Sequence, residues 1–399
     1  MNTLLMILAI FVMALPLGLG FRFAGQSATG NKPYFRDMGT GVAYGFALGA
    51  MLLAVIAYLY IVSWFATGPE ANKYFFFRVA LHGLAIFAVA SIIFKEFGKR
   101  VGTAATRKLF RSMPLTASFG VLTIILYAIL SIFAGVIAPY GQEEILAAAN
   151  VVPGGDPAMG GNPEYPLGTD QIGRDILSRL IYGAQNTVGI AFVTTCLAFF
   201  IGGTLGFLAA TLGGWLDQLL SRAVDVLMAI PALIFALLLM TIASVWANQL
   251  GIPLTYFMVV IIAVIDSTRV FRLARAVGQN IVVMDYIEAA KLRGEGLGYL
   301  IFKEILPNAT APLLAEFGLR FCFVFLTIAS LSFLGVGIQP PLADWGTMVK
   351  DLSQFINFAA FAPQVAAAPL LAAGAIALLT VAVNFVVDWM LHKSSGLKE

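Results

Sequence analysis

The chain has 399 residues, of which 60% are hydrophobic and 11% are charged, and its mean hydropathy is +0.90. Soluble domains carry about 25% charged residues, so this composition excludes an ordinary soluble globular protein. The formal net charge of +3 is too small to indicate a nucleic-acid partner. Two cysteines and two histidines, all in separate stretches, do not suggest a metal centre.

Nine apolar runs have about the length that a helix needs to cross a hydrocarbon core of roughly 30 Å. They lack the alternation of membrane strands, so the predicted fold is an all-α, polytopic membrane helical bundle. The first run has no basic start and no small-residue cleavage site, which favours a retained helix over a signal peptide. The runs are 4–21, 41–66, 75–94, 115–138, 187–212, 226–246, 254–270, 308–335 and 364–391.

A basic segment at residues 95–113 separates the third run from the fourth. It carries six Lys or Arg residues and one acid, Glu96. The positive-inside rule therefore places it in the cytoplasm. We expect three extra membrane helices in residues 1–94, this cytoplasmic basic linker, and a six-helix core in residues 114–399. Both ends of the core are then cytoplasmic, and the N-terminus lies outside.

The link at residues 139–174 is rich in Gly, Pro and acidic residues, which fits the outer face. Residues 151–166 are expected to be irregular. In the following Gly168-Thr169-Asp170, the side chain of Thr169 or Asp170 is predicted to cap the next helix. The alternative is that this stretch contacts a solute directly.

Charged residues continue after this predicted cap. Asp170, Arg174, Asp175 and Arg179 recur near helical spacing and are expected to form a local ion network.

The fifth run has small residues four apart, at Gly202, Gly206, Ala210 and Gly214. Small residues at this spacing let helices pack closely in lipid, so this face is predicted to be a packing face. Residues 213–231 are expected to form a short amphipathic turn.

The longest charged segment of the second half runs from 286 to 307, between two apolar runs. Residues 288–293 favour a helix, which glycines such as Gly294 interrupt. The helix resumes at residues 300–306, and Pro307 is expected to begin a new element. Two short amphipathic helices around a glycine joint indicate a docking surface for a soluble partner.

Within the eighth run, Glu316 and Arg320 are four residues apart in the order that favours a helical ion pair. One interpretation is a polar lining of a translocation path, because charges inside a membrane are costly. The other is an intrahelical pair near the cytoplasmic end. The sequence leaves both open.

Several of these stretches resemble one family. Glu288-Ala289-Ala290, then Gly294 and Pro307, resembles the coupling loop of ABC importer permeases, here residues 276–308. The stretch 166–183 resembles the signature of the dipeptide, oligopeptide and nickel branch, with Gly168, Thr169, Asp170, Gly173, Arg174 and Asp175 at matching positions. Leu-Ser-Phe-Leu-Gly at 331–335 is similar to the same branch.

The resemblance implies a permease subunit of an ATP-driven importer for peptides or a similar small solute, in the bacterial inner membrane. It implies that Glu288, Ala289, Ala290, Gly294 and Pro307 couple this subunit to an ATPase. The chain has no Gly-x-x-x-x-Gly-Lys-Ser/Thr sequence, so it is not expected to bind a nucleotide by the usual loop, and the ATPase is expected to be another polypeptide. The resemblance implies a transport subunit rather than an enzyme, with no cofactor bound by this chain.

The partners that the resemblance implies are two cytoplasmic ATPase subunits or domains carrying ATP and Mg²⁺, a second homologous permease and an extracytoplasmic solute-binding protein. Membrane lipid surrounds the chain, and nucleic acid is not expected. Two other interpretations stay open: a secondary, ion-coupled transporter, which would show paired inverted halves, and a membrane scaffold that moves no solute.

Overall fold

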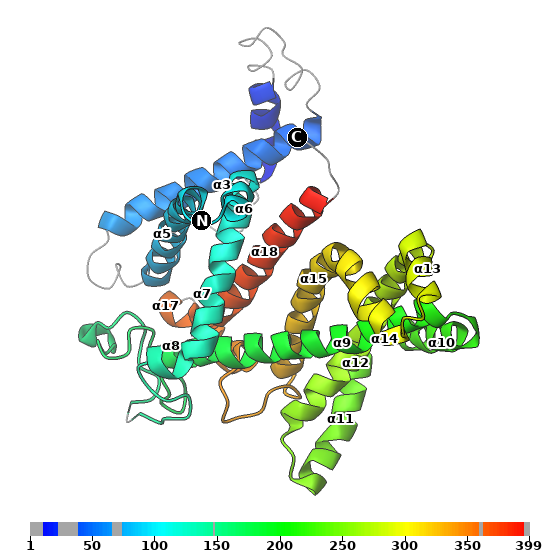
Figure 1. Ribbon diagram of the computed structural model, residues 1–399. Coiled ribbons are helices and arrows are strands. Elements are labelled where there is room, and N and C mark those ends of the chain that lie inside the picture. Colours follow the sequence, from blue (N-terminus) through cyan, green and yellow to red (C-terminus); the bar gives the residue numbers. More distant parts are fainter. Residues whose placement is uncertain (1–10, 23–38, 66–73, 147, 359–361, 395–399) are drawn as a thin grey trace. The chain divides into compact units, whose positions relative to one another are not determined.

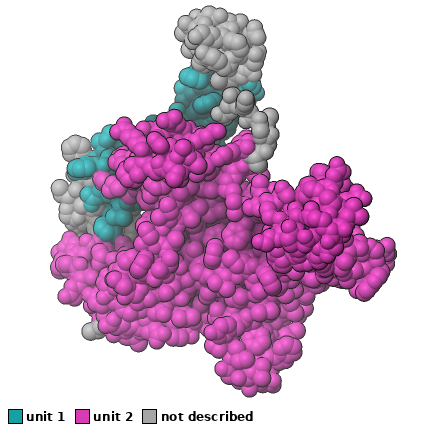
Figure 2. Space-filling view, in the orientation of Figure 1, with its two compact units in different colours: residues 1–81 teal, residues 82–399 magenta. Residues whose placement is uncertain are grey.

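The computed structural model describes residues 11–22, 39–65, 74–146, 148–358 and 362–394. In these residues the chain is all-α, as predicted: helices account for the regular structure, and the β-pairing is confined to isolated bridges at Val152–Gly161 and Thr169–Asp175. The chain forms two compact units, residues 1–81 and 82–399, which Figure 2 shows in different colours.

Eight helices in the described residues are long and apolar enough to cross a membrane. A shorter apolar helix, Phe11–Arg22, covers the described part of the first predicted run. Because residues 4–10 lie outside the described part, a ninth crossing stays a prediction. The eight spans are Thr40–Ile61, Phe77–Arg100, Leu115–Ile137, Ile176–Leu212, Ala232–Leu250, Leu254–Val282, Leu297–Phe333 and Ala368–Lys393.

In the first unit, the helix Phe11–Arg22 packs against α3 (Thr40–Phe65). A Cβ added at Gly18 would lie 2.5 Å from the carbonyl oxygen of Ala43, so glycine permits the close approach of these helices. The Tyr44 hydroxyl donates to the Phe11 carbonyl at 3.2 Å.

The second unit contains the remaining spans and several shorter helices (Figure 1). The boundary between the units falls inside α5 (Phe75–Arg100). The elements that follow are α6 (Ala104–Ser112), α7 (Leu115–Ile137), η1 (Pro157–Met159), α8 (Ile176–Gly183), η2 (Ala184–Val188), α9 (Gly189–Leu212), α10 (Gly214–Ala229), α11 (Ala232–Leu250), α12 (Leu254–Val282), α13 (Asp285–Leu292), α14 (Leu297–Tyr299), η3 (Leu300–Ile305), α15 (Leu306–Phe333), α16 (Trp345–Leu352), η4 (Ser353–Phe358), α17 (Pro363–Ala366) and α18 (Ala368–Ser394).

Gly202, Gly206 and Ala210 of the predicted packing face lie against α12, whereas Gly214 begins α10 and has open space around it. A Cβ at Gly202 would lie 2.3 Å from the Ser267 carbonyl oxygen, and one at Gly206 would lie 2.7 Å from that of Phe271. Residue numbers rise together along both helices, so α9 and α12 run parallel. The C-terminal ends of α9 and α12 therefore lie at the same end of the bundle, which Figure 1 shows together with α10 and α13.

Two apolar cores stabilise the second unit. The larger one joins α7, α8, α11, α12, α15, α16 and α18, with Trp345 and Phe325 among its fully buried side chains. The smaller one joins α9, α12, α13, η3 and α15 around Ile287 and Ile305. The smaller core fixes the segment that follows α12 against the membrane helices.

Several predicted boundaries are wrong. Residues 213–231 contain the sixteen-residue helix α10 rather than a turn, and α11 starts at Ala232. The seventh predicted run ends at 270, but α12 continues to Val282. The last three turns of α12 are charged on one side and packed against α9 on the other. Hydrophobic composition alone therefore did not predict that the helix extends to Val282.

Two further helices are longer than predicted because each contains a wide, π-type turn. The fifth run begins at Ile176, ahead of the π-turn η2. Pro307 lies in the first turn of α15, as predicted, but no break precedes it, because one continuous span runs from Leu297 to Phe333 through η3. At this turn the Leu306 N–H donates to the carbonyl of Ile301, five residues back. Such a widened turn accommodates an adjacent proline ring without breaking the helix.

Candidate functional sites

The segment between α12 and α15, residues 283–305, is called the coupling segment below. Its first helix, α13, begins at Asp285, three residues before the predicted start, and presents two different faces. Ile287 and Ala290 are fully buried in the smaller core. Glu288 and Ala289 are exposed. The two alanines of the predicted motif therefore face in different directions, Ala290 toward its own chain and Ala289 toward solvent.

The outward side of the coupling segment is apolar as well as charged. Leu292 is 83% exposed and Phe302 is 58% exposed. The Glu288 carboxylate has no hydrogen bond or ion pair within the described residues, and α13 has no side-chain cap at Met284. Exposed large apolar side chains beside an unpaired acid are typical of a surface that a partner covers.

Gly294 ends α13 with a left-handed backbone, at φ +81°. The Gly294 N–H donates to the Lys291 carbonyl at 2.9 Å, and the Glu295 N–H donates to the Ala290 carbonyl at 3.2 Å. These two bonds form a Schellman motif, for which glycine is preferred because other residues disfavour positive φ. The predicted bend at Gly294 is present.

The stretch 168–175 folds the loop that precedes α8 rather than forming the predicted helix cap. The Thr169 hydroxyl accepts from the Val151 N–H at 2.9 Å and donates to the Ala148 carbonyl at 2.8 Å. The cap of α8 is Asp175, whose carboxylate accepts from the N–H of Ser178 at 2.7 Å. Residues 166–175 turn twice before the helix begins, so the cap falls five residues later than Asp170.

Asp170 organises the predicted ion network, but without helical geometry. Its carboxylate accepts from the Ile172 and Arg174 N–H groups at 3.1 and 2.9 Å. It also pairs with the Arg174 Nε at 2.7 Å and the Arg179 Nε at 3.8 Å. Asp175 is bonded to Ser178 and takes no part in these ion pairs.

Gly168 and Gly173 have positive φ, at +79° and +84°. A Cβ at Gly168 would lie 2.3 Å from the Val151 carbonyl oxygen, and one at Gly173 would lie 2.6 Å from that of Leu146. Both glycines therefore bring the chain back against residues 146–151. The expected irregular region 151–166 has few regular elements, but its backbone is tied to this turn by the Gly154 N–H bond to the Pro166 carbonyl at 3.0 Å.

At the same end of the bundle, α16 inserts between the membrane helices. Its Trp345 is 2% exposed, packs edge-on against Tyr127 and donates from its indole N–H to the Leu180 carbonyl at 2.9 Å. The buried Asp344 caps α16 and accepts from the Thr187 hydroxyl at 2.8 Å. Burial raises the pKa of Asp344. Sequence reasoning did not single out Asp344, although an aspartate after a Pro-Pro turn is a helix-start signal.

Glu316 and Arg320 form the predicted pair on α15, with 2.7 Å between the Arg320 Nε and a Glu316 carboxylate oxygen. The structure adds two residues of α12. The Asp266 carboxylate lies 3.8 Å from the Arg320 Nη1 and 3.9 Å from the Arg269 Nη1. Arg320 also stacks over the Phe323 ring at 4.6 Å. We call Asp266, Arg269, Glu316 and Arg320 the charged cluster.

The charged cluster is buried to different degrees. The Asp266 and Arg320 side chains are 7% and 10% exposed, whereas those of Glu316 and Arg269 are 21% and 43% exposed. Asp266 is an acid within an apolar run, and that was the available sequence signal for it. The cluster balances two acids with two bases.

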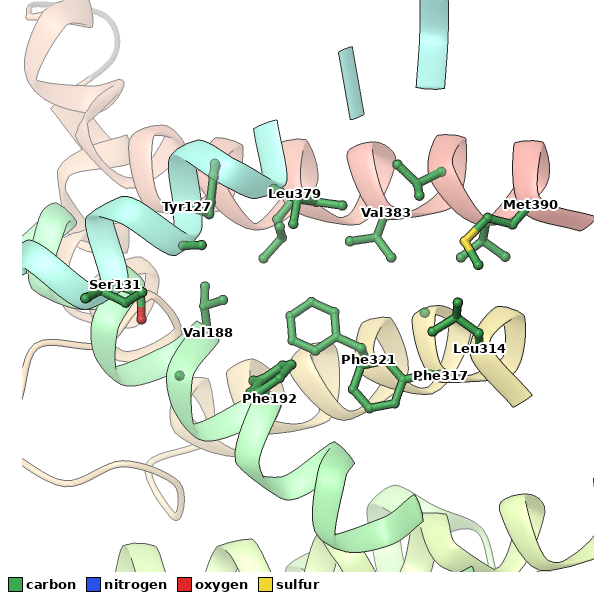
Figure 3. A pocket seen from close by; sticks show the side chains of 17 residues that line it. Tyr127, Ser131, Val188, Phe192, Leu314, Phe317, Phe321, Leu379, Val383 and Met390 are labelled. Carbon is green, nitrogen blue, oxygen red and sulfur yellow. The ribbon is translucent and has the colours of Figure 1, made fainter. Parts of the chain in front are cut away.

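A cavity of about 510 Å³ lies between α7, α9, α15 and α18 (Figure 3). Phe192, Phe317 and Phe321 line it together with aliphatic side chains. Its polar side chains are Ser131 and Tyr127, and the Tyr127 hydroxyl already donates to the Ala375 carbonyl at 2.9 Å.

A bundle of spans with a short, two-faced helix exposed between two of them defines a membrane transport component. The family described as "Binding-protein-dependent transport system inner membrane component" matches residues 202–394. The chain belongs to this family. It is therefore a multi-pass permease component of the bacterial inner membrane. It is a transport subunit, and ATP hydrolysis belongs to a separate subunit.

Curated relatives agree with this placement. The dipeptide transport system permease protein of Haemophilus influenzae is 36% identical over 245 residues, which are 61% of this chain and 79% of the relative. The protein of the same description in Escherichia coli is 35% identical over 61% and 78% of the two chains. A glutathione transport system permease protein of Pectobacterium atrosepticum is 34% identical over 56% and 69%. Neither a secondary transporter nor a scaffold gains support from these relatives.

Proposed function

We propose that this chain is the permease subunit of an ABC importer for short peptides, and that it forms the translocation path together with a second, homologous permease. The supporting observation for the solute is that similar chains are described as dipeptide and glutathione permeases. The supporting observation for the mechanism is the two-faced helix α13, which is anchored in its own chain and open on its other side.

In this proposal the exposed face of the coupling segment docks on a cytoplasmic ATPase. Glu288 and Ala289 contact the ATPase, and Leu292 contributes apolar area. Ala290 joins α13 to the smaller core, so that movement of the ATPase reaches α12 and α15. Gly294 sets the angle of the bend, and Pro307 belongs to the helix that receives the movement.

The partners in this proposal are two ATPase subunits or domains, which bind ATP and Mg²⁺, and an extracytoplasmic binding protein that delivers the solute. Closure of the ATPases on ATP moves the coupling segment and changes the access of the path from one side to the other. Solute is moved only if the two states bind it with different affinity. The polar residues near the middle of α12 and α15 are therefore candidates for contact with the solute.

Glu316 and Arg320 are proposed to lie beside the translocation path, because Glu316 and Arg269 keep part of the charged cluster accessible. Replacing Glu316 or Arg320 by Ala is expected to lower solute uptake by proteoliposomes. Normal uptake by both variants would remove this assignment. Residues 168–175 are proposed to stabilise the outer loop, because Thr169, Asp170 and Asp175 are buried and bonded to their own chain.

The proposed roles of the parts of the chain keep the bounds that the sequence predicts. We propose that residues 114–399 form the transport core and that residues 95–113 lie on the cytoplasmic side. The three predicted helices in residues 1–94 are proposed to seat a partner subunit or to stabilise the core.

Reconstitution tests the proposed function. The chain is assembled in proteoliposomes with the homologous permease, the ATPase subunits and the binding protein. ATP-dependent accumulation of a labelled dipeptide inside the vesicles is expected, and it should vanish when ATP is replaced by a non-hydrolysable analogue. Accumulation without ATP, driven by an ion gradient, would overturn the proposal. ATP hydrolysis with no accumulation of any peptide offered would overturn its solute assignment.

A further inference from the structure

The charged cluster lies at the boundary between the two apolar cores. On α12, Ile262 belongs to the larger core and Ala274 to the smaller one. Asp266 lies between them. On α15, Phe321 belongs to the larger core and Leu313 to the smaller one. Arg320 directly precedes Phe321, so a layer of charge separates the core around the coupling segment from the core of the transport helices.

The helix α12 has a rigid neighbour at this level. Gly202 and Gly206 bring the α9 backbone against α12 at Ser267 and at Phe271, where even a methyl group would clash. Such close helix contact restricts sliding, because protein interiors are packed as densely as molecular crystals. Asp266 is therefore carried on a fixed support.

The contacts of α15 at this level are less directional. Its Phe317 ring meets the Phe199 ring of α9, with centroids 5.1 Å apart and a tilt of 60°. Polar and charged contacts between two helices specify their register more strictly than apolar packing does. Two directional contacts join α15 to α12 in the described residues: Arg320 approaches Asp266 at 3.8 Å, and the Arg269 guanidinium lies over the Phe323 ring at 5.9 Å. The first of them joins two buried charged groups.

We propose that Asp266 is a positioning residue that holds Arg320 across the α12–α15 contact and fixes the register of the two helices. The coupling segment connects these same two helices. With this register fixed, α12 and α15 move together when the coupling segment moves. This inference rests on the proposed function, because it concerns how that function is carried out.

Stability alone is a poor reason for this arrangement. Apolar side chains of similar volume are often at least as stabilising as a buried ion pair, because burial removes the charges from water. Moreover, the Arg320 Nε and Nη1 have no hydrogen-bond partner in the described residues, although Glu316 and Asp266 lie at ion-pair distance. Burial of the charged cluster therefore costs free energy. Fixing the register of α12 and α15 is a role that charged side chains fulfil better than apolar ones.

Four variants of the assembled transporter test this inference: D266N, R320Q, D266N/R320Q and D225N. D225N is the matched control, because Asp225 also pairs with an arginine of α12, Arg272, at 3.3 Å, but both side chains are more than half exposed. Import and ATP hydrolysis are measured on equal amounts of assembled complex. Spin labels at Val264 of α12 and Leu326 of α15, with both native cysteines replaced by Ala, report the distance distribution between the helices.

D266N is expected to broaden this distance distribution and to lower the number of peptides imported per ATP hydrolysed by about tenfold, because Arg320 loses its partner on α12. In the R320Q background, D266N is expected to change this ratio by less than about twofold, since Asp266 acts through Arg320. D225N is expected to match wild type in both measurements.

Three results would overturn the inference: an unchanged distance distribution in D266N, an unchanged import ratio in D266N, or additive effects of D266N and R320Q. Measurements on the wild-type complex distinguish failure of the positioning role from failure of the proposed function. If wild type imports peptide while D266N behaves identically, the positioning role is wrong and the proposed function stands. If wild type imports no peptide, the proposed function fails, and the distance distribution of D266N still decides the register.

Discussion

Replacing Gly294 by Val tests the proposed docking of the coupling segment, because the substitution acts on the backbone alone. Gly294 has φ +81°, and a Cβ added there would have no neighbour within 4 Å. A steric clash is therefore excluded as a cause. An ordinary L-residue with a left-handed backbone costs about 1–2 kcal/mol, and a β-branched residue lies at the upper end.

This cost would be relieved by rotating Gly294 away from its native angle. That rotation breaks the bonds from the Gly294 and Glu295 N–H groups to Lys291 and Ala290 and redirects α13. About 1.4 kcal/mol corresponds to a tenfold change in an equilibrium, so the affinity for the ATPase subunits is expected to fall by about tenfold.

Gly296 offers a matched control two residues away. It is also exposed and also has open space for a Cβ, but its φ is −75°. G296V should therefore bind the ATPase subunits like wild type, whereas G294V should not. G294N should fall between G294V and wild type, because asparagine tolerates the left-handed region better than valine does.

The assay is titration of the labelled ATPase subunits onto nanodiscs that contain the permease pair. Cysteine-accessibility labelling of the same variants checks that membrane insertion is unchanged. Equal affinities for G294V and G296V would refute the reasoning, because the two variants differ in backbone angle and not in available space. Labelling that places residue 294 on the extracytoplasmic side would refute the proposed docking altogether.

Three further predictions concern other parts of the chain. G202V should destabilise the protein by about 2 kcal/mol in thermal unfolding, because its Cβ would meet the Ser267 carbonyl oxygen at 2.3 Å, while G203V, which has open space, should not. The hydrogen bonds from Arg275 hold the pKa of Asp217 below its ordinary value of 3.8, so this contribution to stability is present above pH 3.8 and is lost as pH falls through the lower, folded-state pKa. Wild type should therefore unfold at higher temperature than D217N at neutral pH, and the two should converge in acid; a constant difference would contradict this. Deleting residues 1–93 should impair assembly or transport, measured by co-purification of the partners and by uptake, and an unaffected deletion variant would remove both proposed roles of those helices.

Sequence reasoning was most successful where one local property decides the structure. Apolar length predicted the membrane spans, because the hydrocarbon core imposes one length on every crossing helix. The spacing of Gly202 and Gly206 predicted a packing face, because small residues at this period have few other uses in a membrane helix. The bend at Gly294 followed from the backbone freedom of glycine.

Sequence reasoning failed where a polar residue or a proline is compatible with two different local structures. The seventh apolar run ends at residue 270, yet α12 continues to Val282 because one face of its charged end packs on α9. Pro307 lies in the first turn of α15, as predicted, yet the π-type turn before it leaves no break in the span. Thr169 and Asp170 looked like caps, but their side chains are bonded to residues 148–174.

The sequence by itself determined that this chain is a helical membrane protein with a polar, glycine-jointed segment between two spans, since hydropathy, helix length and glycine angles are local properties. The tertiary structure alone decided that Ala289 faces outward while Ala290 is buried, and that Asp266 lies against Arg320 more than fifty residues further along the chain. The physical reason is that a side chain on a helix becomes buried or stays exposed depending on which face of that helix a second helix packs against. That contact depends on the whole bundle, which no single stretch of sequence contains.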